Sequence, residues 1–213
     1  MIVTTIFILL VLFFSIIIHE IAHGSVALLL GDNTAKNEGR LTLNPLKHID
    51  FFGTIILPFF LLLATRGQGP VFGWAKPVPI NPYNFKDKKW GQLKVAIAGP
   101  AVNFIIAALF GLLIRFVNMP QNFSELISVI VFYNFLWGLF NLLPIPPLDG
   151  SHILFTFLPE SWSKFKIFMN QYGLVILVFL IFFGLGSLGN SARYFSYLVG
   201  GDKLRYLLDN FGS

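Results

Sequence analysis

Four uncharged apolar stretches constrain the fold of this chain more than any other feature of its sequence. A helix of about 20 apolar residues crosses the ~30 Å hydrocarbon layer of a membrane. Only 12% of the 213 residues are charged, whereas soluble domains carry about 25%. We therefore predict a single domain over residues 1–213, an all-α polytopic membrane protein with about four transmembrane helices. The spans are expected near residues 1–30, 93–115, 124–148 and 167–190.

Three shorter segments add to this prediction. Residues 51–65 form an apolar run interrupted by Pro58, which fits either a re-entrant segment or a short span. The Gly- and Pro-rich stretches 31–44 and 67–82 contain short alternations of apolar residues, as small membrane-associated β-strands do. Residues 191–211 have the pattern of an amphipathic tail lying flat on the membrane, and a partly frayed terminus fits them equally well.

The distribution of basic residues predicts how the chain crosses the membrane. If residues 51–65 re-enter, 11 of the 15 Lys and Arg residues share one side, whereas a full crossing divides them 7 to 8. The positive-inside rule then places the N-terminus outside and the end of the first span on the cytoplasmic side. We expect an integral protein of a prokaryotic plasma membrane, and we interpret the net charge of +5 as a topology signal, with no nucleic-acid partner.

A candidate metal-binding motif lies at the end of the first apolar run, where residues 19–23 read His-Glu-Ile-Ala-His. On a helix, residues i and i+4 share a face, so His19 and His23 can bind one zinc ion while Glu20 reaches the same side as a general base. A buried hydrogen-bonded pair or a proton relay is the alternative, but ionisable groups at membrane depth are costly and usually functional. We therefore favour a zinc site.

A catalytic zinc usually has three protein ligands and a water, and the chain contains no cysteine. Asp149 is the candidate third ligand because it follows a run broken by prolines, although it could instead cap a short helix after it. His152 could lie behind the ligands or be an extra ligand. His48 lies in a polar loop and is expected at the membrane interface.

In these motifs the chain resembles the site-2 proteases, the intramembrane zinc metalloproteases of the M50 peptidase class. The resemblance covers nearly the whole chain, including loop segments at 40–50 and 73–82. Phe51 departs from the resemblance, because compact members tend to have Pro after the Ile-Asp pair. The departure bears on the local shape of the loop and not on the chemistry. The motifs that carry the resemblance are His-Glu-Ile-Ala-His at 19–23, Gly-Pro-Ala-Val-Asn at 99–103 and Asn-Leu-Leu-Pro-Ile-Pro-Pro-Leu-Asp-Gly at 141–150.

The resemblance implies roles for individual residues and a compact member without a PDZ or nucleotide-sensing domain. His19, His23 and Asp149 would bind one Zn²⁺ per chain, and Glu20 would be the catalytic carboxylate. Asn103 and Asn141 would line the substrate channel.

The expected function is therefore a zinc-dependent intramembrane endopeptidase that hydrolyses peptide bonds within or next to transmembrane segments of membrane proteins, as in regulated intramembrane proteolysis. Its partners would be such a segment and the lipid bilayer; the sequence does not predict an oligomeric state. The alternative is a membrane zinc or proton transporter using the same His, Glu and Asp side chains. Glu20 between the two histidines favours hydrolysis, because hydrolysis requires a base there and transport does not.

Overall fold

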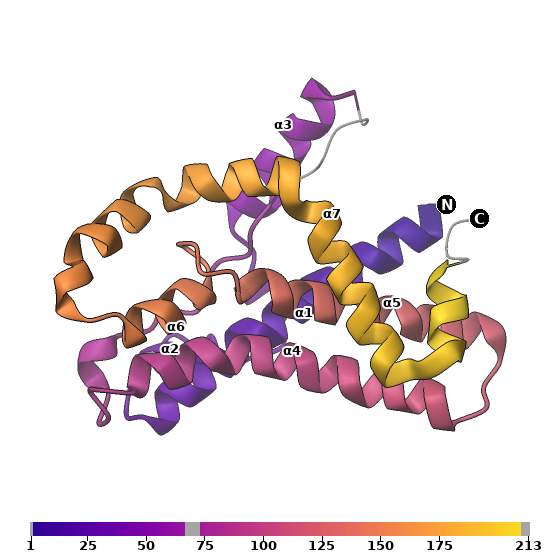
Figure 1. Cartoon of the computed structure of the whole chain (residues 1–213), viewed down its shortest axis with the longest axis horizontal. Coiled ribbons are helices and arrows are strands. Elements are labelled where there is room, and N and C mark those ends of the chain that lie inside the picture. The colour runs from indigo at the N-terminus through magenta and orange to yellow at the C-terminus, as the bar shows by residue number, and fades with distance from the viewer. Residues whose placement is uncertain (1, 67–72, 210–213) are drawn as a thin grey trace.

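The computed structural model describes residues 2–66 and 73–209, and this part of the chain is helical with no strand. Long helices make up most of the molecule, as Figure 1 shows. They are α1 (Ile2–Leu29), α4 (Gly91–Phe116), α5 (Gln121–Asn141) and α7 (Ser163–Asp209). The shorter helices are α2 (Thr34–Asn37), α3 (Leu57–Ala64) and α6 (Asp149–Phe157), with a π-helix at Phe51–Ile56 and 3₁₀ turns at Pro45–Lys47, Pro82–Asn84 and Glu160–Trp162.

Four segments of the described chain are long and apolar enough to cross a membrane, which confirms the expected integral membrane protein. The third ends at Asn141, earlier than predicted, because prolines at 144, 146 and 147 follow and cannot continue a helix. The segments are Thr5–Leu29, Gly91–Phe116, Gln121–Asn141 and Glu160–Ile181.

Helix α4 lies at the centre of the packing and contacts α1, α5, α6 and α7. Its buried residues Ala107 and Ile114 pack with Ile127 and Val131 of α5 in the largest apolar cluster. The packing of α4 against α1 and α6 brings the predicted site residues together, because α1 carries residues 19–23 and α6 begins at Asp149.

The C-terminal tail is helical to Asp209, and α7 is kinked at Gly201, whose φ is 68°. Figure 1 shows α7 curving over the other helices before it descends into this tail. The apolar face of the tail packs against α4 and α5 instead of facing lipid, because Leu204 is fully buried and Leu207 and Leu208 are nearly so. Residues 210 and 211 of the predicted tail lie outside the described residues.

The prediction of small β-strands is wrong for the described residues. Residues 34–37 form a helical turn, and residues 73–81 are irregular and pair with no strand. Pro77 and Pro79 lack the backbone N–H that a strand ladder needs, so the alternation of Val78 and Ile80 comes from the intervening prolines. Residues 67–72 of the predicted stretch lie outside the described residues.

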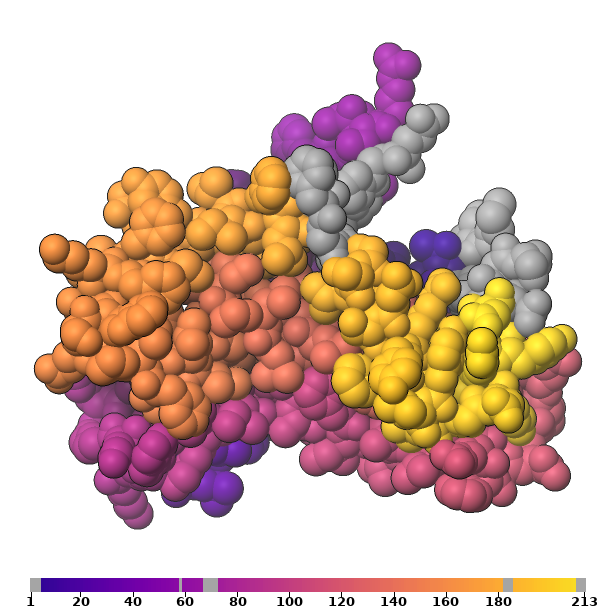
Figure 2. Space-filling model, in the orientation of Figure 1, coloured from indigo at the N-terminus to yellow at the C-terminus, as the bar shows by residue number. Residues whose placement is uncertain are grey.

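The apolar segment Phe51–Ala64 stands away from the helical body, as Figures 1 and 2 show. It combines the π-helix with α3, and its large side chains are exposed, including Phe51, Phe59 and Phe60. Helices rise about 1.5 Å per residue, so this segment is too short for the ~30 Å hydrocarbon layer.

Candidate active site

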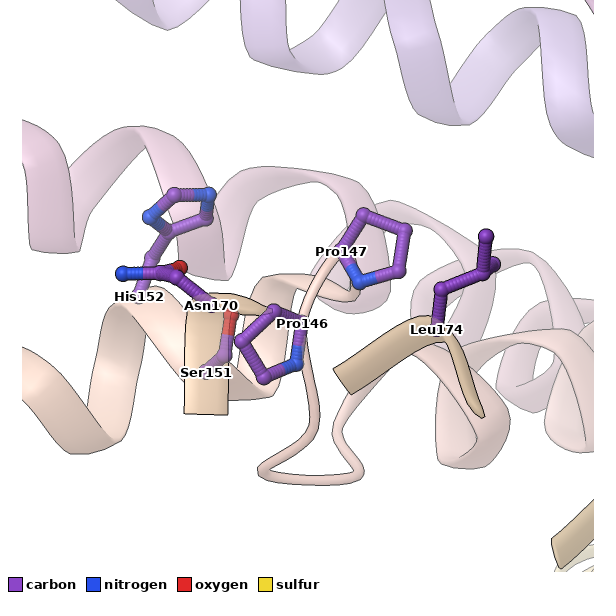
Figure 3. Close-up of a pocket in the computed structure, with 6 residues that line it drawn as sticks. All are labelled: Pro146, Pro147, Ser151, His152, Asn170 and Leu174. Carbon is purple, nitrogen blue, oxygen red and sulfur yellow. The ribbon is translucent and has the colours of Figure 1, made fainter. Parts of the chain in front are cut away.

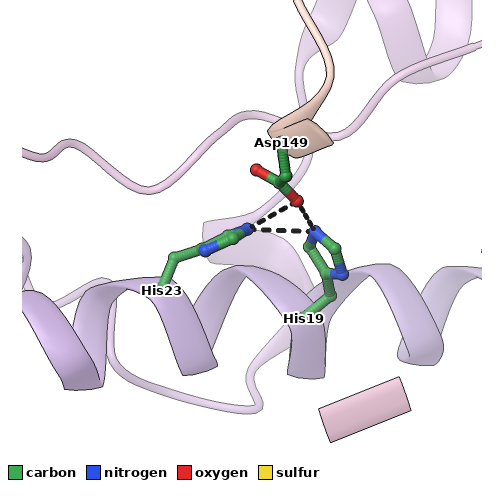
Figure 4. Close-up of side chains that lie close together, drawn as sticks. All are labelled: His19, His23 and Asp149. Carbon is green, nitrogen blue, oxygen red and sulfur yellow. Dashed lines mark hydrogen bonds and ion pairs between the residues drawn. The ribbon is translucent and has the colours of Figure 1, made fainter. Parts of the chain in front are cut away.

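The two histidines of the predicted motif and Asp149 meet in one buried cluster. Figure 4 shows both imidazoles pointing from α1 towards the Asp149 carboxylate, which belongs to the first turn of α6. His19 Nε2 lies 3.0 Å from His23 Nε2 and 3.0 Å from Asp149 Oδ2. The third edge of the triangle, from His23 Nε2 to Asp149 Oδ2, is 3.2 Å. Leu148 occupies the N-cap position of α6, so Asp149 does not act as its N-cap.

Hydrogen bonds on the far side of each ring fix which nitrogen faces the cluster. His23 Nδ1 lies 2.7 Å from the carbonyl oxygen of Val95, which can only accept a hydrogen bond, so Nδ1 carries the proton. His19 Nδ1 lies 2.7 Å from Asn103 Oδ1. The Asn103 amide nitrogen donates to the carbonyl oxygen of Ser15, which identifies the atom facing His19 as an acceptor. Both rings therefore present an Nε2 lone pair to the cluster.

Two imidazole lone pairs and a carboxylate oxygen converge here, and this arrangement fits a metal cation. Each neutral ring carries its one proton on Nδ1, so no hydrogen lies between the two Nε2 atoms and the Asp149 oxygen. Their lone pairs therefore repel one another. Zinc–ligand bonds of about 2.0–2.1 Å in a tetrahedral site place ligand atoms about 3.3–3.4 Å apart, close to the observed 3.0–3.2 Å. Two histidines and one aspartate would leave the fourth position open.

Helix α4 approaches the two imidazoles closely at Gly99. A Cβ built at this position would lie 2.4 Å from His23 Nε2 and 2.5 Å from His19 Nε2. Asn103 is one turn further along the same helix, where it bonds His19. The spacing of Gly99 and Asn103 therefore serves two purposes, since glycine leaves room for the metal-facing atoms and asparagine orients a ring.

Glu20 lies beside the cluster on α1 and is held by a different segment. Its Oε2 accepts a hydrogen bond of 2.8 Å from the backbone N–H of Val78. We call residues 74–81, which run past Glu20, the strap. The contact engages one carboxylate oxygen and orients Glu20 without placing it among the three converging groups.

The strap is tied down by hydrogen bonds from residues 32–54. The Arg40 guanidinium donates to the carbonyl oxygens of Lys76 (2.7 Å) and Pro77 (3.2 Å). The backbone N–H of Lys76 donates to the carbonyl oxygen of His48 (2.8 Å). At the far end, the backbone N–H of Asn81 donates to Asp32 Oδ2 (2.7 Å). These contacts hold the N–H of Val78 where it donates to Glu20.

Arg40 and His48 therefore have structural surroundings that the sequence did not predict. Arg40 is only 4% exposed and His48 is fully buried, whereas His48 was expected at the membrane interface. His48 Nε2 donates to the carbonyl oxygen of Thr42 (2.8 Å). The one sequence signal for Arg40 is its place at the start of the loop segment 40–50, which shares the family resemblance.

The remaining predicted residues are not among the three converging groups. His152 Nδ1 pairs with Gln92 Nε2 at 3.0 Å and is not one of the three converging groups. The Asn141 amide donates to the carbonyl oxygen of Trp137 (3.0 Å), and Asn103 is fully buried. Contact of Asn103 or Asn141 with substrate stays a prediction.

A pocket of about 380 Å³ lies beside the proline-rich loop that precedes Asp149 (Figure 3). None of the three converging groups lines it. Its walls are formed by the loop, the start of α6 and one face of α7, through Pro146, Pro147, Ser151, His152, Asn170 and Leu174.

Comparison with known proteins decides the family. The model of peptidase family M50 matches residues 117–182. YwhC of Bacillus subtilis, which carries the name of a zinc metalloprotease, is 38% identical over 190 residues, covering 85% of this chain and 82% of YwhC. The chain belongs to peptidase family M50.

More distant relatives carry similar names. Rip2 of Mycolicibacterium smegmatis, with a zinc metalloprotease name, is 33% identical over 78% of this chain and 63% of its own length. Zinc metalloprotease MJ0392 of Methanocaldococcus jannaschii is 31% identical over 52% of this chain and 34% of its own length. No solved structure matches the chain. As an M50 member, the chain is an intramembrane zinc metalloprotease, and these names give no support to the transporter alternative.

Proposed function

We propose that His19, His23 and Asp149 bind one zinc ion per chain and that Glu20 is the catalytic carboxylate of an endopeptidase that cleaves transmembrane segments. The convergence of two Nε2 lone pairs and one carboxylate oxygen within 3.2 Å supports the ligand set. The position of Glu20 next to His19 on α1, with one oxygen engaged by Val78, supports its separate role.

The chemistry divides between the ion and the protein. When bound, zinc supplies a Lewis acid that polarises a peptide carbonyl and acidifies a water at its open position. Glu20 would accept the proton of the attacking water on Oε1, since the N–H of Val78 holds Oε2. The water oxygen bonds to the carbonyl carbon of the peptide, and the C–N bond breaks. Glu20 then returns the proton to the leaving amine. The N–H of Val78 keeps the carboxylate oriented through both transfers.

The substrate must be unwound before it reaches this site. A transmembrane helix satisfies its own backbone hydrogen bonds, and its scissile carbonyl is shielded until a turn opens. We propose that the opened segment enters beside the strap, where Glu20 lies. Asn141 and Asn103 remain candidates for contact with its backbone.

We also propose that the site faces the cytoplasm of a prokaryotic cell and that residues 51–65 re-enter the membrane. With re-entry, four basic residues remain for the other side, namely Arg115, Arg193, Lys203 and Arg205. Arg115 and Lys203 lie together where α4 ends, donating to the carbonyl oxygens of Leu198 and Val117. Reporter fusions after residues 45 and 70 should report the same side, and opposite sides would refute re-entry.

The test of the function is cleavage by the zinc-loaded protein in liposomes, with a single-span membrane protein as substrate. Wild type is expected to cleave it, and Glu20→Gln is expected to keep its zinc and lose cleavage. His152→Ala is the matched control, because His152 lies near the cluster without joining it, and it should cleave. A Glu20→Gln protein that still cleaves at the wild-type rate would overturn the proposed role of Glu20.

A further inference from the structure

A line of buried polar side chains connects His19 on α1 to Asn134 on α5. Asn134 Oδ1 accepts a hydrogen bond of 2.9 Å from Asn103 Nδ2. Asn103 Oδ1 in turn lies 2.7 Å from His19 Nδ1. Asn134 is 2% exposed and Asn103 is fully buried, so this line runs through the interior of the bundle.

The direction of each amide in this line follows from the acceptors around it. Asn134 Nδ2 donates to the carbonyl oxygen of Ile130 (2.9 Å), so its oxygen must face Asn103. Asn103 Nδ2 then donates one hydrogen to Asn134 and the other to the carbonyl oxygen of Ser15. Its oxygen is left for the N–H of His19.

Reversing the Asn103 amide would have a chemical consequence at the cluster. Its nitrogen would then face His19 Nδ1, which would have to accept and lose its proton to Nε2. A proton on Nε2 would remove the lone pair that faces His23 and Asp149. Asn134 and the carbonyl oxygen of Ser15 both oppose this reversal, because a reversed Asn103 would direct its oxygen at theirs.

We propose that Asn134 is a positioning residue that acts through Asn103 to keep His19 in the tautomer whose Nε2 can bind the metal. This inference rests on the proposed role of His19 as a ligand. A purely structural role is the alternative, since asparagines also join helices within membranes by hydrogen bonds. The two roles differ in what happens to the His19 ring.

The test combines two variants and two readouts other than cleavage. Asn134→Leu replaces asparagine by a side chain of similar size that has no oxygen to accept the hydrogen bond from Asn103. Asn134→Asp keeps an acceptor oxygen that can face Asn103 at the same size, and should restore the wild-type properties. Zinc affinity is measured by chelator competition. The ¹⁵N shifts of the ring nitrogens in the metal-free, histidine-labelled protein report the tautomer, and the chain has only 4 His to assign.

We expect Asn134→Leu to bind zinc 10- to 100-fold more weakly, the range seen when outer partners of metal ligands are lost. More of the His19 rings than in wild type should then carry their proton on Nε2 instead of Nδ1. Asn134→Asp should recover both the zinc affinity and the tautomer of wild type. Ser128→Ala is the matched control on α5, because the buried Ser128 hydroxyl donates to the carbonyl oxygen of Glu125 on its own helix and is not part of the line to His19.

The outcomes separate this inference from the proposed function. Unchanged zinc affinity and an unchanged His19 tautomer in Asn134→Leu would overturn the positioning role while leaving the ligand set intact. Unchanged zinc affinity in His19→Gln would instead overturn the ligand set. If Asn134→Leu does not fold, Asn134→Ser is measured in the same way, since its hydroxyl can bond Ile130 but is too short to reach Asn103, and the same loss is expected.

Discussion

The groups that face the metal position and the group that would move a proton are held by different kinds of structure. His19 and His23 lie on α1 and are oriented by partners on α4, another long helix. Glu20 is oriented by the strap, which has no regular structure and is tied down by side chains from residues 32–54. Zinc binding and proton transfer should therefore respond to different substitutions.

The largest effect is expected where α4 meets the two imidazoles. Gly99→Ala should abolish zinc binding, because its methyl group would lie 2.4 Å from His23 Nε2 and 2.5 Å from His19 Nε2. Alanine favours a helix over glycine by about 1 kcal/mol, so helix propensity alone would make this variant more stable. A loss of zinc would therefore come from the contact with the two imidazoles. Zinc content by atomic absorption is the measurement.

Gly189→Ala is the matched control for this change. Gly189 is also helical, and a Cβ there meets nothing within 4 Å. It should keep its zinc. A Gly99→Ala protein that also retains full zinc would contradict the close packing of α4 against the cluster.

The strap should show the complementary result. Arg40→Ala removes the hydrogen bonds to the carbonyl oxygens of Lys76 and Pro77 and so lets Val78 shift over Glu20. A displacement of about 1 Å in a catalytic arrangement can cost about 100-fold in rate. We expect a loss of that order in kcat with zinc content unchanged.

Lys36→Ala, at an exposed residue of α2, is the control and should cleave normally. Loss of zinc in Arg40→Ala would show that zinc binding depends on the strap as well as on α4. A wild-type kcat would show that Arg40 does not hold the strap.

The smallest effect is expected at the far end of the strap, where Asp32 is buried. Burial raises the pKa of this carboxyl, but hydrogen bonds from Thr34, Asn81 and Asn84 outweigh it and hold the pKa below its usual value. Its contribution to stability is therefore complete above the unfolded pKa of about 3.9 and is lost as the pH falls through the lower folded pKa.

Asp32→Asn should cost about 1.5–3 kcal/mol at pH 7, the range for hydrogen bonds to a charged group. The difference in thermal midpoint between wild type and variant, measured in detergent, should shrink as the pH drops below about 4. A difference that is constant from pH 7 to pH 3 would contradict this pKa shift.

The sequence predicted the parts of this structure that depend on local pattern. Run length and apolar content predicted four spans, and the i, i+4 spacing placed His19 and His23 on one face. The contacts of Arg40 with the strap join residues 36 and 37 positions apart, and no local pattern reports them.

Two features show why the rest could not be predicted. The register between α4 and α5, which joins Asn103 to Asn134, depends on packing between apolar faces that look alike in sequence. The expected strand failed because the alternation around Val78 came from prolines that cannot pair in a ladder.

The central claim is that His19 and His23 together hold zinc, and X-ray absorption at the zinc edge of the purified protein tests it most directly. Wild type should show imidazole scattering from two histidines, with zinc–nitrogen distances of about 2.0–2.1 Å, and His23→Gln should lose half of that scattering or all of its zinc. Zinc-loaded wild type without imidazole scattering, or the same two-histidine spectrum in His23→Gln, would contradict the account.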